Sequence, residues 1–229
     1  MKLQHFGMAA LLAAAAVPAA AAQFDFYKLG RGAGDFLPSD GIACTGGDLC
    51  SSNADGGVLN GDLTFSTGGI TAHATAFFTD GASAVVQDHE SGWTATKGAG
   101  LGVYHTTHPV DTSDDNITRG ETLTLTFDQV VHLTAIGLRS DGHNFTNWST
   151  GATFLFDGIS TALPSDDGLI DGLNKTGSVF TFAYGGTHAD QFYLSGVTVN
   201  AVPEPETYAL MIAGLGVMGF LSRRRKQSI

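Results

Sequence analysis

Gly120-Glu121-Thr122-Leu123-Thr124-Leu125-Thr126-Phe127 alternates small polar and apolar side chains from Thr122 to its end. Successive side chains of a β-strand point to opposite faces. Leu123, Leu125 and Phe127 therefore face one way, and the three threonines face the other. The alternation predicts a strand of an antiparallel sheet that is buried on one face only.

The same two-residue period recurs on both sides of this stretch. Asp80-Gly81, Asp141-Gly142 and Asp157-Gly158 are turn signals between the alternating segments, and no long segment before the C-terminal tail has a helical period. About ten strands in one domain predict an all-β fold, a single antiparallel β-sandwich of jelly-roll type. The other candidate strands are Leu63 to Ser66, Ile70 to Thr79, Ala84 to Gln87, Trp93 to Thr96, Leu101 to Tyr104, Val130 to Leu138, Thr153 to Phe156, Val179 to Phe182 and Phe192 to Val199.

Residues 1–22 have the three parts of an N-terminal signal peptide. Lys2 supplies the positive start, Met8 to Val17 the apolar centre, and Ala19 to Ala22 the small side chains that signal peptidase accepts. We expect a signal helix, export through the Sec translocon and cleavage after Ala22. The alternative is a retained N-terminal anchor, for which the apolar centre is short.

Removal of both ends of the chain leaves residues 23–202, which is the usual size of one domain. This part keeps 6 of the 11 basic residues and 20 of the 22 acidic ones, so its formal net charge is −14. Such a charge argues against nucleic acid as a partner. Together with abundant Gly, Thr, Ser and Asp, it favours an exported protein that holds divalent cations or neutral sugars.

Cys44 and Cys50 are the only cysteines of the chain and lie in a Gly-rich segment. In an oxidising compartment an isolated pair of this kind predicts a local disulfide. The alternative is a metal or redox pair, which lacks both the two-residue spacing and further ligands nearby in the sequence.

Residues 203–229 form a tail with three parts. The acidic triad Pro203-Glu204-Pro205 comes first, and a predicted transmembrane segment over residues 207–221 follows. Its apolar run of Tyr208 to Leu221 would be roughly 21 Å long as a helix, short of the roughly 30 Å hydrocarbon core. The cations Arg223, Arg224, Arg225 and Lys226 come last, and they should stay in the cytoplasm. The domain would then lie on the far side of the inner membrane.

Residues 203 to 226 resemble the PEP-CTERM sorting tail of exopolysaccharide-producing Gram-negative bacteria. The resemblance implies that exosortase, a membrane-embedded cysteine transpeptidase, recognises the Pro-Glu-Pro triad, cuts near it and releases or re-attaches the domain. The alternative is an ordinary C-terminal anchor that is never processed. Gly214, Gly216 and Gly219 make the run a marginal span.

The stretch from Gly100 to Phe127 resembles a pattern of PEP-CTERM ectodomains, in which a Gly-Leu-Gly-Val strand precedes an Asp-Asn loop and a Glu-led strand. A calcium ion takes six to eight oxygen ligands, which a loop of carboxylates and carbonyls can supply. A solvated turn rich in Asp and Asn is the alternative to a calcium site. The candidate ligands are Asp111, Asp114, Asp115, Asn116 and Glu121.

The loop from Asp141 to Trp148 mixes aromatic and amide side chains. A sugar site needs a ring for stacking and groups that donate and accept hydrogen bonds, so Asn144, Asn147 and Trp148 are candidate ligand residues. Packing of the tryptophan in the core is the alternative. His105 and His108 are interpreted as surface histidines rather than metal ligands.

No hydrolase motif is found in the sequence. We therefore predict a non-enzymatic exported protein of the cell surface or the extracellular matrix, structural or adhesive, with polysaccharide as its ligand class and exosortase as its processing partner. The alternative is a secreted glycan-active enzyme on the same fold, which would need two facing carboxylates in a groove.

Overall fold

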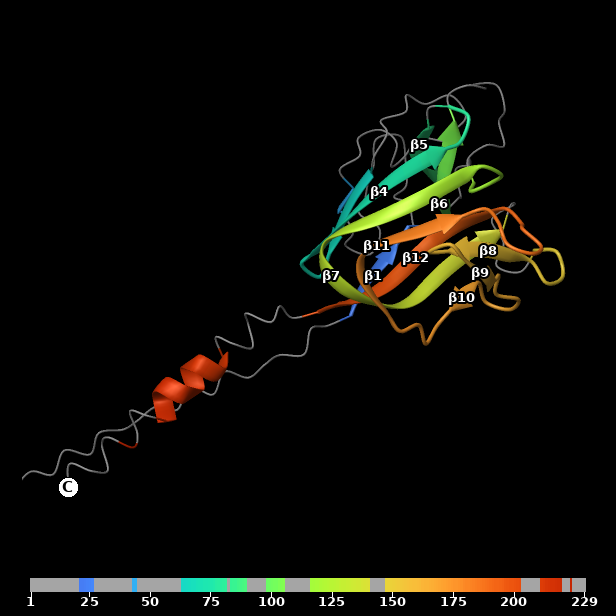
Figure 1. Ribbon diagram of the computed structural model, residues 1–229. Helices are drawn as coiled ribbons and strands as arrows, with labels where there is room; N and C mark the ends of the chain where they lie inside the picture. Colours follow the sequence, from blue (N-terminus) through green and yellow to red (C-terminus); the bar gives the residue numbers. More distant parts are fainter. Residues whose placement is uncertain are drawn as a thin grey trace, which may run out of the picture.

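The structure of the protein is a computed structural model, which describes residues 21–26, 43–44, 63–81, 83–89, 98–105, 116–140, 147–202 and 211–219 together with Arg223. Within these residues lie twelve β-strands and a helix of residues 211–219 (Figure 1). The strands are β1 (Ala22–Asp25), β2 (Ala43–Cys44), β3 (Leu63–Thr67), β4 (Ile70–Phe78), β5 (Ser83–His89), β6 (Gly98–His105), β7 (Glu121–Ser140), β8 (Thr153–Phe156), β9 (Ile159–Ala162), β10 (Leu169–Ile170), β11 (Lys175–Ala183) and β12 (Phe192–Ala201).

The long strand β7 has partners along both of its edges. Its first half, from Glu121 to Phe127, pairs with β4 on one edge and with β11 on the other. In its second half, β7 still pairs with β11 as far as Leu133. On the other edge β12 takes the place of β4 and pairs with β7 from Val131 to Ser140. The partner changes at Asp128 to Val130, which we call the β7 corner, and Figure 1 shows the strand turning back there. β4 and β12 therefore diverge from the corner along the same edge of β7.

Hydrogen-bonded pairs join all twelve described strands into one sheet, with the path β2-β3-β4-β7-β11-β8-β9. β12 extends the sheet from the second half of β7, with β1 and β6 as its other partners and β5 beyond β6. All named pairs are antiparallel, which confirms the prediction of an all-β antiparallel fold. This single network does not confirm two separate sheets, so the jelly-roll sandwich stays a prediction.

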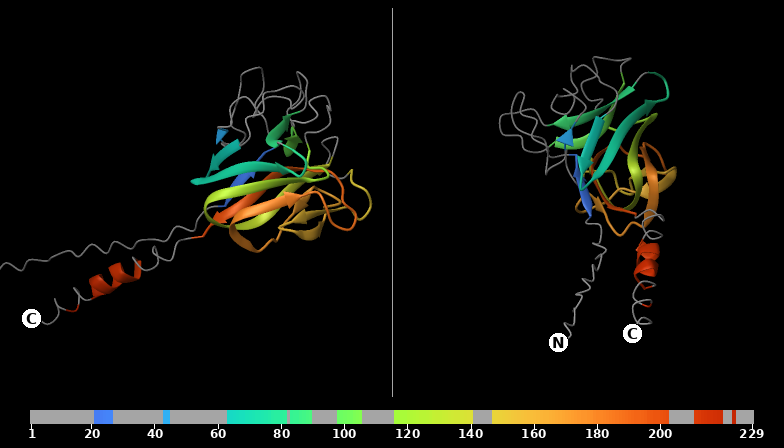
Figure 2. Two further views of the ribbon diagram at one scale, coloured as in Figure 1. Left: turned by 45° about the horizontal axis from the view of Figure 1, so that its top comes forward. Right: turned by 90° about the vertical axis from the view of Figure 1, so that its left-hand side faces the viewer.

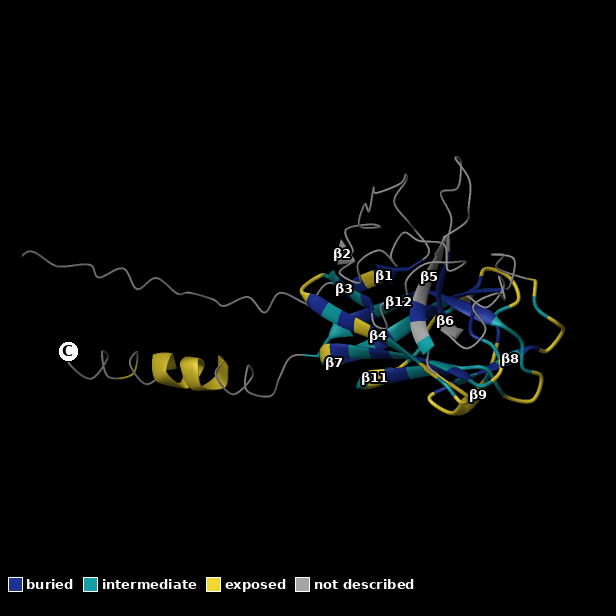
Figure 3. Ribbon diagram, turned by 90° about the horizontal axis from the view of Figure 1, so that it is seen from above, coloured by how far each residue is buried: buried dark blue, intermediate teal, exposed yellow. Residues whose placement is uncertain are grey.

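The period-two pattern of the sequence agrees with the observed burial. Leu123, Leu125 and Phe127 are buried, and the threonines between them are half-buried. Figure 3 shows this alternation along β7 and β11. The buried side chains form one core, in which aromatic rings make edge contacts, such as Phe24 with Phe127 at a centroid distance of 5.8 Å and Phe26 with Phe65 at 4.9 Å.

Several predicted strand boundaries differ from the structure. The sequence predicts two strands where β7 is one, because Asp128 and Gln129 bend the chain without leaving the sheet. The carboxylate of Asp128 accepts the backbone N–H of Thr71 at the start of β4 (3.1 Å), and the Gln129 amide donates to the carbonyl of Gly69 in the turn between β3 and β4 (3.2 Å). The predicted strand from Trp93 to Thr96 lies outside the described residues.

The described helix of the C-terminal tail is shorter than the transmembrane segment that the sequence predicts over residues 207–221. It covers residues 211–219, all of which are exposed (Figure 3). Among the residues that the structure describes, no helix combines the length and the apolar character needed to cross a membrane.

Strand β1 joins the two ends of the domain. Ala22 pairs with Val199 and Asp25 pairs with Gly196, so the first described strand lies antiparallel to the last one. Ala22 is itself buried in the core, one residue inside the predicted signal peptide. The predicted domain boundary after Ala22 therefore falls within β1.

The backbones of β1 and β12 approach each other closely at Gly196. A Cβ atom added at Gly196 would lie 2.6 Å from the carbonyl oxygen of Phe24, a distance at which something must shift. Gly196 is therefore required by the close packing of two backbones, which is a frequent reason for glycine inside a strand.

We predict that Gly196→Ala lowers the free energy of unfolding of the exported domain by about 1–3 kcal/mol, because the added methyl group overpacks a backbone contact. Gly177→Ala is the matched control, since its Cβ would meet its nearest neighbour, the Phe180 ring, at an ordinary 3.7 Å. Urea unfolding followed by circular dichroism measures both. Equal losses in the two variants would contradict the proposed contact.

Candidate functional site

The last strand of the domain ends directly before the Pro-Glu-Pro triad. Ala201 pairs with Val131, and the N–H of Val202 donates to the carbonyl of Val130 at 3.1 Å. Pro203 is the next residue. No linker therefore separates the hydrogen-bonded sheet from the triad.

Three chain segments meet where the tail leaves the sheet. The β7 corner lies there, bound through Gln129 to Gly69 of the turn and through Asp128 to Thr71 of β4. β1 begins at the same end, because Ala22 pairs with Val199 near the end of β12 (Figures 1 and 2). We call the set Gly68, Gly69, Asp128, Gln129, Val130 and Val202 the tail-exit end.

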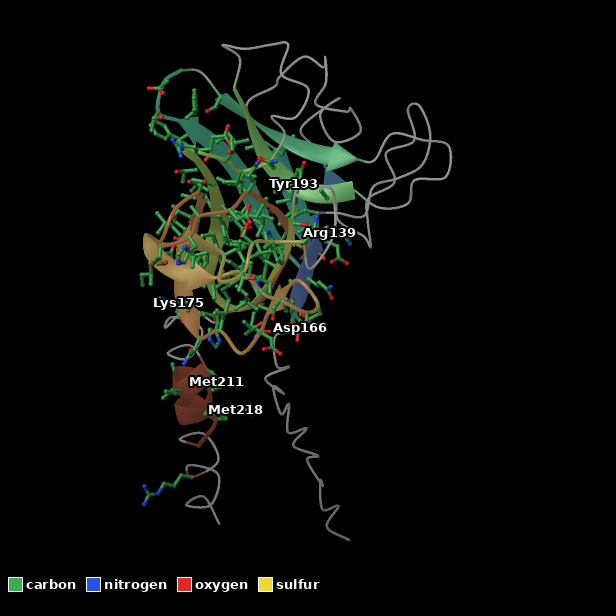
Figure 4. All side chains as sticks on the ribbon, turned by 90° about the vertical axis from the view of Figure 1, so that its right-hand side faces the viewer. Arg139, Asp166, Lys175, Tyr193, Met211 and Met218 are labelled. Atoms are coloured by element: carbon green, nitrogen blue, oxygen red, sulfur yellow. The ribbon has the colours of Figure 1, made fainter. Side chains whose placement is uncertain are left out.

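The described part of the tail beyond the triad exposes apolar side chains. Ile212 and Leu215 are about two-thirds exposed, and Met211 and Met218 project from the helix (Figure 4). An added Cβ atom at Gly214, Gly216 or Gly219 would meet nothing within 4 Å. A helix with this exposed apolar surface needs a lipid or protein environment to cover it. Arg223, the described residue of the basic end, is exposed.

A pocket of about 220 Å³ lies on the face of β1, β12 and β7, beside the loop before β10. Directly paired residues of antiparallel strands share a face. The pairs place Leu169, Gly137, Gly196 and Asp25 in one row across four strands. The two central members of the row, Gly137 and Gly196, are glycines, which we call the glycine floor. An added Cβ atom would lie 2.7 Å from the Ser195 hydroxyl oxygen at Gly137 and 2.6 Å from the carbonyl oxygen of Phe24 at Gly196.

Polar side chains surround this glycine floor. Ala135, Thr198 and Gln23 form the next row of the same face. The Gln23 amide donates to the Asp25 carboxylate at 3.1 Å, and Asp25 is only 6% exposed. Two carboxylates, two hydroxyls and one amide therefore line the pocket, which are those of Asp25, Asp167, Ser195, Thr198 and Gln23.

The loop before β10, which includes Asp167 and Gly168, forms one hydrogen bond to β7 and one within itself. The N–H of Leu138 donates to the carbonyl of Gly168 at 2.7 Å. The Asp167 carboxylate accepts the N–H of Leu169 at 2.9 Å. Beyond the pocket the same face continues to Arg139 and Tyr193, which pair with each other and are buried; Figure 4 shows them near one another, with Asp166 on the same side.

The structure describes two of the five predicted calcium ligands, Asn116 and Glu121, while Asp111, Asp114 and Asp115 lie outside the described residues. Both described side chains are buried. The Glu121 carboxylate accepts the N–H of Thr118 at 2.7 Å, and the Asn116 amide donates to the Gln191 side chain at 2.9 Å. The described ranges contain no group of three or more His, Cys, Asp or Glu residues that could hold a metal.

The structure describes two of the three predicted sugar-binding residues, Asn147 and Trp148. Trp148 is half-buried against the core, and its indole N–H donates to the carbonyl of Gln191 at 3.2 Å. Asn147 is exposed, and Asn144 lies outside the described residues. Trp148 thus has the core contacts that the alternative interpretation expected.

The predicted disulfide cannot be compared with the structure. Cys50 lies outside the described residues, and of Cys44 only the backbone, in β2, is described.

Sequence reasoning missed the pocket. Its one visible signal is the occurrence of Gly137 and Gly196 inside apolar strand patterns, since glycine within a strand often marks a β-bulge or the close approach of another backbone or a ligand. The registers that place these glycines side by side cannot be read from either strand alone.

The comparisons with known proteins bear on the tail. Residues 201–226 match the PEP-CTERM protein-sorting motif. The chain matches no curated protein and no solved structure. The match thus begins at the last residue of β12 and includes the triad, the described helix and the basic end.

The chain therefore carries a C-terminal protein-sorting signal. That signal is the PEP-CTERM motif of exosortase substrates, as the sequence predicted. It indicates an exported, membrane-anchored precursor that is processed to the cell surface.

Proposed function

We propose that the protein is a non-enzymatic component of the cell surface or of the extracellular matrix, structural or adhesive, and that exosortase removes or replaces its tail. The observation that carries the proposal is the PEP-CTERM motif at residues 201–226, directly after the last strand. A folded domain with a detachable membrane tail is the arrangement that a surface protein needs. The domain reaches its destination only after the tail is cut.

The precursor would sit in the inner membrane with its C-terminus in the cytoplasm. The Arg223 to Lys226 cluster supports this orientation, because cations next to an apolar segment are retained on the cytoplasmic side. At the other end of the chain, the Sec translocon and signal peptidase would act on residues 1–22. Both ends of the domain would therefore have a membrane attachment during export.

Polysaccharide is the ligand class that we assign to the pocket over Gly137 and Gly196. A sugar ring presents hydroxyl groups around its edge and C–H groups on its faces. The pocket offers carboxylate, hydroxyl and amide groups around the glycine floor, with the Ser195 hydroxyl beside Gly137. Leu169, which is 44% exposed, adds an apolar wall. Its volume of about 220 Å³ is small for a ligand site and suits one sugar unit.

A glycan-active enzyme is the second candidate, because two carboxylates line the same pocket. Asp25 and Asp167 come from different elements, as paired catalytic acids usually do. Both also have structural hydrogen bonds, from the Gln23 amide and from the N–H of Leu169 respectively. We favour binding without catalysis, and product formation from the same glycan distinguishes the two.

Calcium at the loop before β7 is a further part of the proposal. Asn116 is 1% exposed, and its side-chain oxygen has no hydrogen-bond partner among the described residues. A buried oxygen of this kind costs about 1–3 kcal/mol unless something binds it, and a cation would do so. Asp114 and Asp115 precede Asn116 in the chain and would supply the charge.

We predict that the surface-exposed protein lacks residues 208–229 in a host that carries exosortase. The apolar run is too short for a secure anchor and follows a processing motif. Intact-mass analysis of surface fractions measures the retained fraction, and an exosortase-deficient host is the control. Retention of the tail by most molecules in the exosortase-bearing host would exclude the processing role.

A separate prediction concerns ligand binding in the pocket over Gly137 and Gly196. Thr198→Tyr should fill the space over the glycine floor and weaken binding of oligosaccharides from the host's exopolysaccharide about tenfold. Thr176→Tyr, at an exposed strand position outside the pocket, should bind like the unchanged protein. Calorimetric titration measures the affinities.

A product assay on the same oligosaccharides accompanies this titration. If the unchanged protein cleaves them and Asp167→Asn does not, the enzyme alternative replaces the binding proposal. If both tyrosine variants bind equally well, the ligand lies elsewhere.

We also predict that calcium raises the melting temperature of the exported domain. At one hundred times its dissociation constant the ion would add about 2.7 kcal/mol to the stability. For a domain of this size the melting shift is about 5–10 °C. Chelator should lower the melting temperature, and Asp115→Ala should abolish the response. A solvated turn would respond equally to sodium chloride of the same ionic strength.

A further inference from the structure

The triad that exosortase reads begins one residue after a backbone hydrogen bond of the sheet. Val202 donates its N–H to Val130, and Pro203 follows. We propose that the tail-exit end of the folded domain is a contact surface for exosortase while the tail is cut. This inference rests on the processing proposed above and names the part of the domain that meets the enzyme.

Chain length leaves little space between the domain and the enzyme. A fully extended residue spans at most about 3.5 Å, so Glu204 lies within about 7 Å of Val202 and Tyr208 within about 21 Å. The headgroup layer of the membrane occupies about 6 Å of the distance between Val202 and Tyr208. Enzyme groups that hold Glu204 from several sides must therefore reach the surface next to Val202.

The tail-exit end is shaped for such an approach. Gly68 and Gly69 are exposed and have no side chains, so the backbone there is accessible. Val130 is 47% exposed and is the apolar side chain beside Val202. The hydrogen bonds of Asp128 to Thr71 and of Gln129 to Gly69 fix the corner to β4 and its turn, so little conformational freedom remains to be lost on binding.

The charge of this surface favours a protein partner over the lipid surface. Attraction to anionic headgroups depends on clustered Lys and Arg residues close to the membrane. The tail-exit end contains neither, and its single charged side chain is Asp128, whose carboxylate accepts a backbone N–H. An apolar residue beside an exposed backbone suits contact with another protein.

The test is the rate of tail removal from the full precursor in an exosortase-bearing host, followed by pulse labelling and mass analysis. Val130→Glu and Val130→Lys should each slow removal roughly threefold to tenfold, because either charge disrupts an apolar contact. Ile159→Glu is the matched control, a β-branched side chain that is 58% exposed in β9, outside the tail-exit end, and it should be processed like the unchanged protein.

A second set of variants separates contact from other effects. Insertion of about twelve Gly and Ser residues between Val202 and Pro203 adds a mean span of about 19 Å. With this linker, the Val130 variants should be processed at the same rate as the linker protein with Val130 unchanged. The released domains should have unchanged melting temperatures, which shows that the substitutions act on processing and not on folding.

Each outcome decides one point. If the unchanged precursor keeps its tail, the processing proposal fails, and the contact surface fails with it. If the unchanged precursor is processed and the Val130 variants keep its rate, only the contact surface is wrong. Faster removal from Val130→Lys with slower removal from Val130→Glu would assign the surface to lipid headgroups instead. Slow processing of Ile159→Glu, or of the Val130 variants with the linker, would also overturn the contact.

Discussion

Backbone hydrogen bonding along both edges of β7 is the constraint on which the rest of the domain depends. This strand of twenty residues pairs with β4, β10, β11 and β12, so four strands of the sheet are hydrogen-bonded directly to it. The corner at Asp128 to Val130 lets one continuous strand serve both parts of the sheet. The same corner supplies the carbonyl that holds Val202, and so it also fixes the point from which the sorting tail leaves.

The sequence predicts the strands well where each has its own alternation. Leu123, Leu125 and Phe127 are buried as expected, and Asp157-Gly158 forms the expected turn, with positive φ at both residues. At the corner the sequence predicts two strands, one that ends at Phe127 and one that begins at Val130. The side chains of Asp128 and Gln129 bind Thr71 and Gly69, and these contacts are with residues about sixty positions away.

The two candidate sites differ in how far a sequence can reveal them. The sorting motif is linear, since the triad, the apolar run and the cations act in order along one segment. The sequence predicts it from residue 203 to residue 226, and the match begins two residues earlier, at residue 201. The pocket is made by register. Gly137, Gly196 and Asp25 become neighbours only when three strands pair in one alignment, and no local pattern fixes that alignment. The predicted calcium ligands lie close together in the sequence, and two of the five are described.

The pairing of β1 with β12 has a consequence for the timing of export. Gln23 crosses the membrane near the beginning of export, and its partner Thr198 crosses near the end. Closing a loop of about 180 residues costs about 4–5 kcal/mol of chain entropy, and that closure has to wait until both ends are outside. β1 and β12 can therefore pair only after nearly the whole domain has crossed the membrane. The closing pair of the sheet is thus the last one that export allows to form.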